Sequence, residues 1–300
     1  MKLFRNHGPR ARGLKAVLTA GVVATAATAA FAPSAMAAAP TGNFADFKYC
    51  PYNQAGTDYC FYSETLSGSF KLGNANVPIN KKIVLQGGFG TGPNGEATWK
   101  GAVGAPALSP TKLTVPGGLT GLFDPQPGWN GILTELLEAA INAANGVTAT
   151  AELVGPVGFD SGAFLERTGT GLQLPLRIKL DNPFLGDSCY IGSASSPVLL
   201  KLTTGTTAPP APNTPISGDP GSVTLPDNGD QVIQFGGYTL VDNSFSVPRA
   251  SGCGPLLFRP LINAAVNLKE GFPSAAGKNT AILKGNAKIA FPGDIAASVR

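Results

Sequence analysis

A short stretch of the chain holds four of its six tyrosines, together with two cysteines. The four are Tyr49, Tyr52, Tyr59 and Tyr62. Each ring offers a flat apolar face for stacking and a hydroxyl for hydrogen bonding, so the group is a candidate surface for binding cell-envelope glycan or another envelope protein. The alternative is that the rings point inward and close one end of the hydrophobic core. The sequence leaves both interpretations open.

The cysteines indicate disulfide chemistry rather than a metal site. They are Cys50, Cys60, Cys189 and Cys253. They form no CxxC pair, which argues against zinc, and four cysteines permit three disulfide pairings. We favour Cys50 with Cys60 and Cys189 with Cys253. From loop-closure entropy, we expect the Cys189–Cys253 bond, which closes the longer loop, to stabilise the fold by about 4 kcal/mol. The Cys50–Cys60 bond should stabilise it by about 3 kcal/mol.

Few residues are suited to catalysis. The only histidine is His7, which lies in a predicted export signal, so the mature chain offers no imidazole for a catalytic triad or a metal. Ser109 and Lys112 match an S-x-x-K motif but precede a β-type run instead of starting a helix. Two carboxylates in one cleft could hydrolyse glycans, but sequence cannot show which of 18 acidic residues approach each other. No catalytic residue is predicted, and no cofactor is expected because phosphate-binding and dinucleotide motifs are missing.

Two Asp-Asn couplets follow strand-like runs and could hold polar sites. They are Asp181-Asn182 and Asp242-Asn243. Asx turns that cap the chain at a strand end are the expected structure, with a shared polar or calcium site as the alternative. Residues 227–230 (Asp-Asn-Gly-Asp) lack the spacing and the terminal glutamate of a complete calcium loop.

The first 37 residues have the organisation of a secretory signal. A positive segment precedes an apolar stretch from Ala16 to Ala32, and Ala35-Met36-Ala37 suits the cleavage site. Cleavage removes five of the 22 basic residues and none of the 18 acidic ones, so the formal charge changes from +4 to −1. With this charge the mature chain, residues 38–300, is not predicted to bind nucleic acid. After cleavage of the signal it is not predicted to span the membrane. We expect it to be extracellular, including a cell-wall-associated location, where cysteines are oxidised.

Short β-type runs dominate the mature chain. Charged residues make up 13%, about half the usual share of roughly 25%, and glycine and proline are abundant. Strands are predicted over 69–72, 82–86, 112–115, 147–154, 172–180, 197–202, 222–225, 231–235 and 238–247. Gly87-Gly88 is expected to end the second run, residues 90–110 to form a loop, and residues 280–291 to form a hairpin that turns at Gly285-Asn286. Asn228-Gly229 predicts another hairpin turn.

Apolar residues recur with helical spacing over 130–145 and 260–269, which predicts two amphipathic helices. Residues 172–180 alternate with period two, as in an antiparallel strand with one buried face, and Pro175 predicts an edge or bulged strand. Residues 206–215 contain four prolines and should be extended and exposed. The fold class that follows is mainly β: one antiparallel β-sandwich-like domain over 38–300, with one or two short amphipathic helices.

Five stretches carry a family resemblance. They are residues 84–88 (VLQGG), 207–213 (TAPPAPN), 240–245 (LVDNSF), 250–254 (ASGCG) and 276–281 (AGKNTA). With them the chain resembles uncharacterised secreted, four-cysteine proteins of actinobacteria over most of its mature length. The resemblance implies a secreted location. It transfers no catalytic residue, because no activity is assigned to that family.

The leading functional prediction is a non-enzymatic secreted or cell-envelope-associated protein with a structural or binding role. One alternative is a carboxylate-dependent hydrolase of envelope glycans. The other is a carrier of an apolar ligand between its sheets.

Overall fold

The computed structural model describes residues 39–122, 144–225 and 231–300, which lie in one compact unit running from Ala38 to Arg300. The predicted signal segment, the helix predicted over 130–145 up to residue 143, and the Asn228-Gly229 turn lie outside the described residues.

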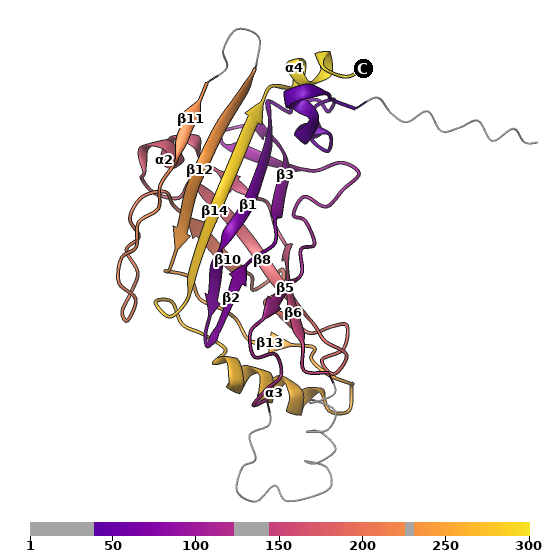
Figure 1. Ribbon diagram of the computed structural model, residues 1–300, viewed down its shortest axis with the longest axis vertical. Coiled ribbons are helices and arrows are strands. Elements are labelled where there is room, and N and C mark those ends of the chain that lie inside the picture. Colours follow the sequence, from indigo (N-terminus) through magenta and orange to yellow (C-terminus); the bar gives the residue numbers. More distant parts are fainter. Residues whose placement is uncertain (1–38, 123–143, 226–230) are drawn as a thin grey trace, which may run out of the picture. The chain divides into compact units, whose positions relative to one another are not determined.

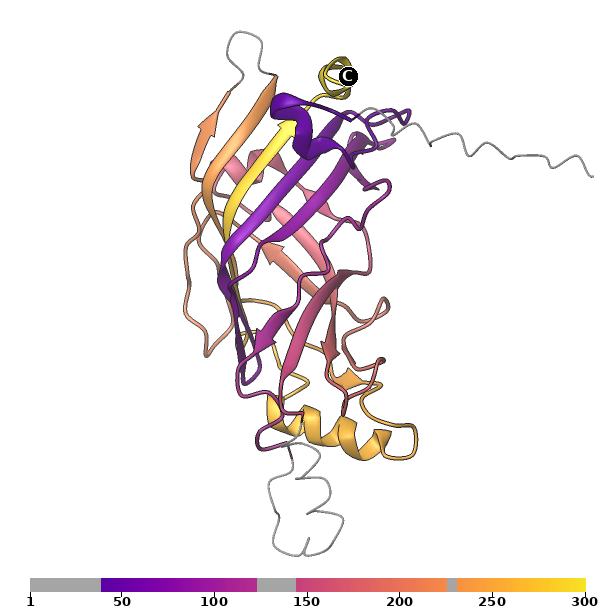
Figure 2. The same ribbon diagram turned by 45° about the vertical axis from the view of Figure 1, so that its right-hand side comes forward.

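Two seven-stranded antiparallel sheets pack against each other (Figures 1 and 2). The first sheet has the order β11 (Ser222–Thr224), β12 (Val232–Asp242), β14 (Thr280–Ala290), β1 (Tyr59–Leu72), β3 (Ile83–Thr91) and β4 (Ala97–Gly101), with β2 (Ala75–Ile79) paired to β1. The second has the order β13 (Ala250–Ser251), β9 (Tyr190–Ile191), β8 (Leu172–Asp181), β6 (Val147–Leu153) and β5 (Leu113–Val115), with β10 (Val198–Leu202) and β7 (Gly158–Phe159) also paired to β8. The predicted β-sandwich-like class is confirmed.

The described helices are short and lie at the edges of the sandwich. They are η1 (Gly42–Phe47), α2 (Ser161–Glu166), α3 (Arg259–Glu270) and α4 (Pro292–Ala297). Figure 1 shows α3 across one end of the two sheets and α4 at the other. The helix predicted over 260–269 is thus confirmed as α3. Nowhere in the described ranges does a helix combine the length and the apolar character that crossing a membrane requires.

The main core lies between the sheets and follows from alternation along the strands. The inward side chains of β8 are all buried, namely Leu172, Leu174, Leu176, Ile178 and Leu180. A second, smaller cluster includes Phe47, Tyr62 and Ile295 and joins η1 and α4 to the first sheet. The β-sandwich therefore has one large apolar interior and a separate apolar cap.

Of the two alternatives predicted for β8, an edge strand or a bulged strand, the edge strand is wrong. β8 lies inside the sheet, with β6 and then β7 paired along one side and β9 and β10 paired along the other. Proline is accommodated because Val154 N–H donates to Pro175 O at the point where β6 ends, and β7 pairs again only from Gln173. Pro175 has no N–H to return a hydrogen bond to Val154 O, and this missing bond falls where the β6 ladder has already ended.

The hairpin predicted over 280–291 is also wrong, because β14 is one continuous strand. Glycine is needed at position 285 because β1 approaches closely there. A Cβ atom at this position would overlap Glu64 O on β1. The register shifts beside Gly285 on both neighbours, between Thr65 and Ser67 on β1 and between Phe235 and Tyr238 on β12. A Gly-Asn pair that is typical of a turn serves as the site of two bulges instead.

Two other predictions for glycine-rich segments are also wrong, namely the strand end at Gly87-Gly88 and the loop over residues 90–110. Gly87-Gly88 does not end the second strand, since β3 continues to Thr91. Gly87 leaves room for the indole of Trp99, which a Cβ would approach to 2.5 Å. That tryptophan belongs to β4, a strand within the predicted loop 90–110. β12 ends at Asp242, short of the predicted end at residue 247.

Candidate functional site

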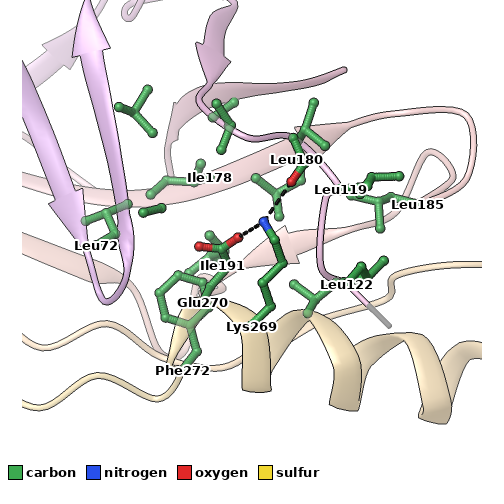
Figure 3. A pocket seen from close by; sticks show the side chains of 17 residues that line it. Leu72, Leu119, Leu122, Ile178, Leu180, Leu185, Ile191, Lys269, Glu270 and Phe272 are labelled. Carbon is green, nitrogen blue, oxygen red and sulfur yellow. Dashed lines mark hydrogen bonds and ion pairs between the residues drawn. The ribbon is translucent and has the colours of Figure 1, made fainter. Parts of the chain in front are cut away.

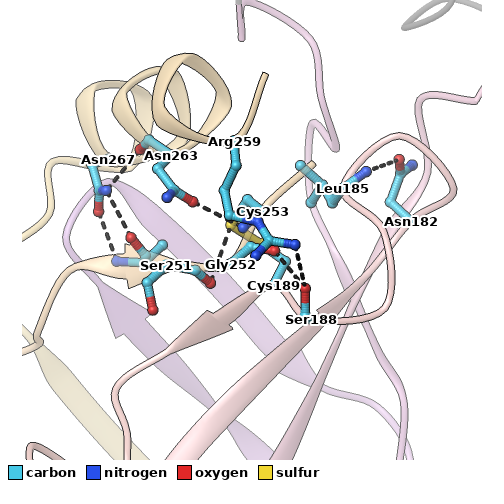
Figure 4. The surroundings of a disulfide bond; sticks show 11 residues. Asn182, Leu185, Ser188, Cys189, Ser251, Gly252, Cys253, Arg259, Asn263 and Asn267 are labelled. Carbon is cyan, nitrogen blue, oxygen red and sulfur yellow. Dashed lines mark hydrogen bonds between the residues drawn. A yellow bond between two sulfur atoms is a disulfide. The ribbon is translucent and has the colours of Figure 1, made fainter. Parts of the chain in front are cut away.

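Both favoured disulfides are present, and the longer one helps to hold α3. Cys50 bonds to Cys60 and Cys189 to Cys253. Around the second bond, Cys253 N–H donates to Asn263 Oδ1 on α3 at 2.9 Å (Figure 4). The covalent link therefore fixes the chain directly before the helix against the end of the second sheet.

An amide clamp fixes α3 further along. Asn267 is 8% exposed, and its Oδ1 accepts from Ala250 N–H at 2.7 Å while its Nδ2 donates to Ala250 O at 2.9 Å. These bonds pair the side chain with β13 as a neighbouring strand would (Figure 4). Ile262 and Val266 are buried on the same helix and contribute to the main core. The helix is therefore attached by packing, by hydrogen bonds and by the disulfide.

A cavity of about 40 Å³ lies between α3 and the ends of both sheets. Its lining is aliphatic and aromatic apart from Lys269 and Glu270 of α3 (Figure 3). The apolar lining includes Leu72, Val77, Leu119, Ile178, Val266 and Phe272. We call this space the first cavity.

Three more cavities continue from the first between the sheets. The second has a volume of about 40 Å³, the third about 30 Å³ and the fourth about 10 Å³. Consecutive cavities share wall residues, so single layers of side chains separate them. The shared residues are Leu72, Val77, Ala149 and Ile178 between the first and second, Phe70, Ile83, Ala151 and Leu176 between the second and third, and Ser63, Leu172 and Tyr238 between the third and fourth.

Polar groups in this row of cavities are few, and the charged ones lie at the end beside α3. Lys269 and Glu270 stand in the first cavity, whereas the far end has the hydroxyls of Ser63, Thr65 and Tyr238. The Tyr238 hydroxyl lies 2.8 Å from Ser63 Oγ, and burial raises the pKa of this phenol. Ser109 and Thr111 are the polar residues of the second cavity.

The carboxylates of the described chain gather in none of these spaces. Of the described residues that line the four cavities, Glu270 is the single acid, whereas glycoside hydrolysis requires two. Across the described ranges, no three histidine, cysteine or acidic side chains meet in a group that could hold a metal ion.

The four predicted tyrosines do not share one surface. Tyr59 is half-buried against the main core and stacks on Phe89 with ring centroids 5.2 Å apart. Tyr62 is buried in the smaller cluster, and half-buried Tyr52 packs against that cluster. Tyr49 is half-buried beside Lys48, whose Nζ lies 4.8 Å from the ring centroid. Burial raises the pKa values of Tyr59 and Tyr62. This distribution resembles a cap on the core more than a binding face.

Both Asp-Asn couplets form the predicted Asx turns. Asn182 Oδ1 accepts from Phe184 N–H at 2.7 Å, and Asp242 Oδ1 accepts from Ser244 N–H at 2.8 Å. Asp242 is 3% exposed, and its burial raises the pKa of the carboxyl group. Its second oxygen accepts from Lys201 N–H at 2.7 Å, so backbone donors occupy both oxygens.

Comparison of the chain with family models, with curated proteins and with solved structures gave no match. The function must therefore be inferred from the geometry of the cavities and from the residues that line them.

Proposed function

We propose that the protein is a secreted, non-enzymatic binding protein that takes up an apolar ligand between its two sheets. The row of four cavities is the observation that carries the proposal. Protein interiors normally pack as densely as organic crystals, with few voids larger than a water molecule. A succession of voids along one core is therefore a feature that packing alone does not require.

The chemistry of the walls determines what such voids can hold. A water molecule needs about 10–15 Å³ and two to four polar partners. The first two cavities exceed that volume at about 40 Å³ each, but apolar side chains form most of their walls. Apolar cavities stay dry and bind apolar molecules. An elongated apolar ligand could occupy several cavities if the side chains between them changed rotamer.

Two disulfides support the secreted part of the proposal, because disulfides form and persist mainly in oxidising compartments. Association with the cell envelope stays a prediction.

The direct test is binding of diphenylhexatriene, a rod-shaped fluorescent hydrocarbon, to the chain comprising residues 38–300. We expect saturable fluorescence enhancement. Ala149→Leu and Ala151→Leu place bulk at the first two junctions and should each weaken binding while the fold is retained. Ala97→Leu, an identical change at an exposed position of β4, is the matched control. Absence of saturable binding, or equal binding by all variants, would refute the proposal.

A further inference from the structure

The first cavity differs from the others by its charged pair. Among the described residues, Lys269 and Glu270 are the only charged ones that line the four cavities. Their side chains are 19% and 14% exposed, so water reaches them poorly. Figure 3 shows both rising from α3 beside apolar side chains. A ligand that enters the row from this end would place one polar group here and its apolar remainder in the cavities beyond.

The pair has unused hydrogen-bonding capacity. Lys269 Nζ donates to Glu270 Oε1 at 2.6 Å and to Gly118 O at 2.7 Å. An ammonium group carries three N–H donors, so one remains. Within the described ranges, no hydrogen bond reaches Glu270 Oε2. The pair therefore offers one free donor and one free acceptor side by side.

The charge balance selects among possible ligand head groups. The pair is neutral overall, and an anionic head group would compete with Glu270 for Lys269 and leave one carboxylate unpaired in a poorly solvated space. Leaving a buried charge without its partner is strongly unfavourable. A cationic head group would compete with Lys269 for Glu270 and leave the Lys269 ammonium group unpaired. A hydroxyl can donate to Oε2 and accept from the third N–H, and it disturbs no charge.

We propose that the ligand is an uncharged amphiphile, such as a long-chain alcohol, whose hydroxyl group binds to the Lys269–Glu270 pair. This inference rests on the proposed function and specifies the class of ligand. The alkyl chain would extend from α3 past Leu72 and Ile178, which border both the first and the second cavity.

The test measures displacement of diphenylhexatriene by decan-1-ol, by its methyl ether and by decanoate. The ether lacks the hydroxyl donor, and decanoate adds a negative charge. We expect the alcohol to bind about tenfold more tightly than the ether, which corresponds to one hydrogen bond to a charged group. Decanoate should also bind more weakly than the alcohol.

Variants then assign the preference to the pair. Lys269→Met combined with Glu270→Met removes both charges together and so avoids an unpaired one. This variant should retain binding of the ether and lose the preference for the alcohol. Lys288→Met combined with Asp46→Leu, which removes an ion pair outside the four cavities, should leave the preference unchanged. Thermal unfolding of each variant verifies that it is folded.

Equal affinity of the wild-type protein for alcohol and ether would overturn the head-group inference while leaving the proposed function intact. Tightest binding of decanoate, or a preference that persists in the double variant, would overturn it equally. Failure of all three compounds and of the fluorescent probe to bind would refute the proposed function as well.

Discussion

Replacing Asn267 by leucine tests whether the amide clamp holds α3 against the sandwich. The change keeps the side chain close to the same volume but removes the partners of Ala250 N–H and Ala250 O. Ala250 is 2% exposed, so water cannot replace these hydrogen bonds without a local opening.

The expected cost follows from the two backbone groups that are left without partners. Each buried unsatisfied group costs about 1–3 kcal/mol, so the pair should cost about 4 kcal/mol. Leucine recovers about 0.5 kcal/mol because it favours the helix more than asparagine does. The expected loss in free energy of unfolding is therefore about 3 to 4 kcal/mol.

Urea denaturation followed by circular dichroism measures this loss directly. Asn263→Leu is a graded comparison, because the side chain of Asn263 accepts one hydrogen bond, from Cys253 N–H, so that its loss should cost less. Leu268→Ala, at a position 80% exposed on the same helix, should stay within about 0.5 kcal/mol of wild type. A loss below about 1 kcal/mol for Asn267→Leu would show that the clamp contributes little.

Three further predictions concern other parts of the fold. Serine at both positions of the Cys189–Cys253 bond should lower the free energy of unfolding by about 4 kcal/mol, more than removal of the shorter disulfide; the order of the two urea midpoints decides this. A hydrogen bond from Lys179 lowers the pKa of Asp181, so its carboxylate stabilises the fold above pH 3.8 and loses this effect as the pH falls through the lowered pKa. Asp181→Asn should therefore be less stable than wild type at pH 7 and indistinguishable from it in strong acid; a constant difference in urea midpoint across this range would contradict the assignment. Gly285→Ala should cost about 1 to 3 kcal/mol because its Cβ would overlap Glu64 O, whereas Gly101→Ala, with open space around its Cβ, should be nearly neutral in thermal unfolding.

The sequence predicted those strands and helices whose pattern depends on residues close to one another along the chain. Period-two alternation located β8, and helical spacing located α3, because both patterns reflect which side of one element is buried. Sequence-based prediction failed where a residue contacts a segment that is distant along the chain. Gly285 resembles a turn residue in sequence, but its small size is needed for the approach of Glu64 O, which only the β1–β14 pairing reveals.

The candidate site was missed for a related reason, although one signal was present. Ile262, Val266 and Lys269 follow one another at spacings of four and three, so a charged side chain falls on the buried stripe of α3. A charge on such a stripe indicates either an ion pair or a ligand. The cavity itself gives no such signal, since its walls are the aliphatic residues of any β-sandwich core.

The five stretches for which the sequence analysis predicts a family resemblance contain residues with a structural role. Three of them meet through asparagines: Asn213 Nδ2 donates to Asn243 O at 2.9 Å and to Asn279 O at 2.8 Å. Asn279 is fully buried, and its Nδ2 donates to Phe245 O at 3.0 Å. A fourth stretch contains Cys253. These residues fix loops, and each needs a specific side chain. A site that binds apolar groups needs only size and shape, which many aliphatic residues supply equally well. For a protein with the proposed function, the most distinctive sequence marks the scaffold, and binding must be tested at the cavities themselves.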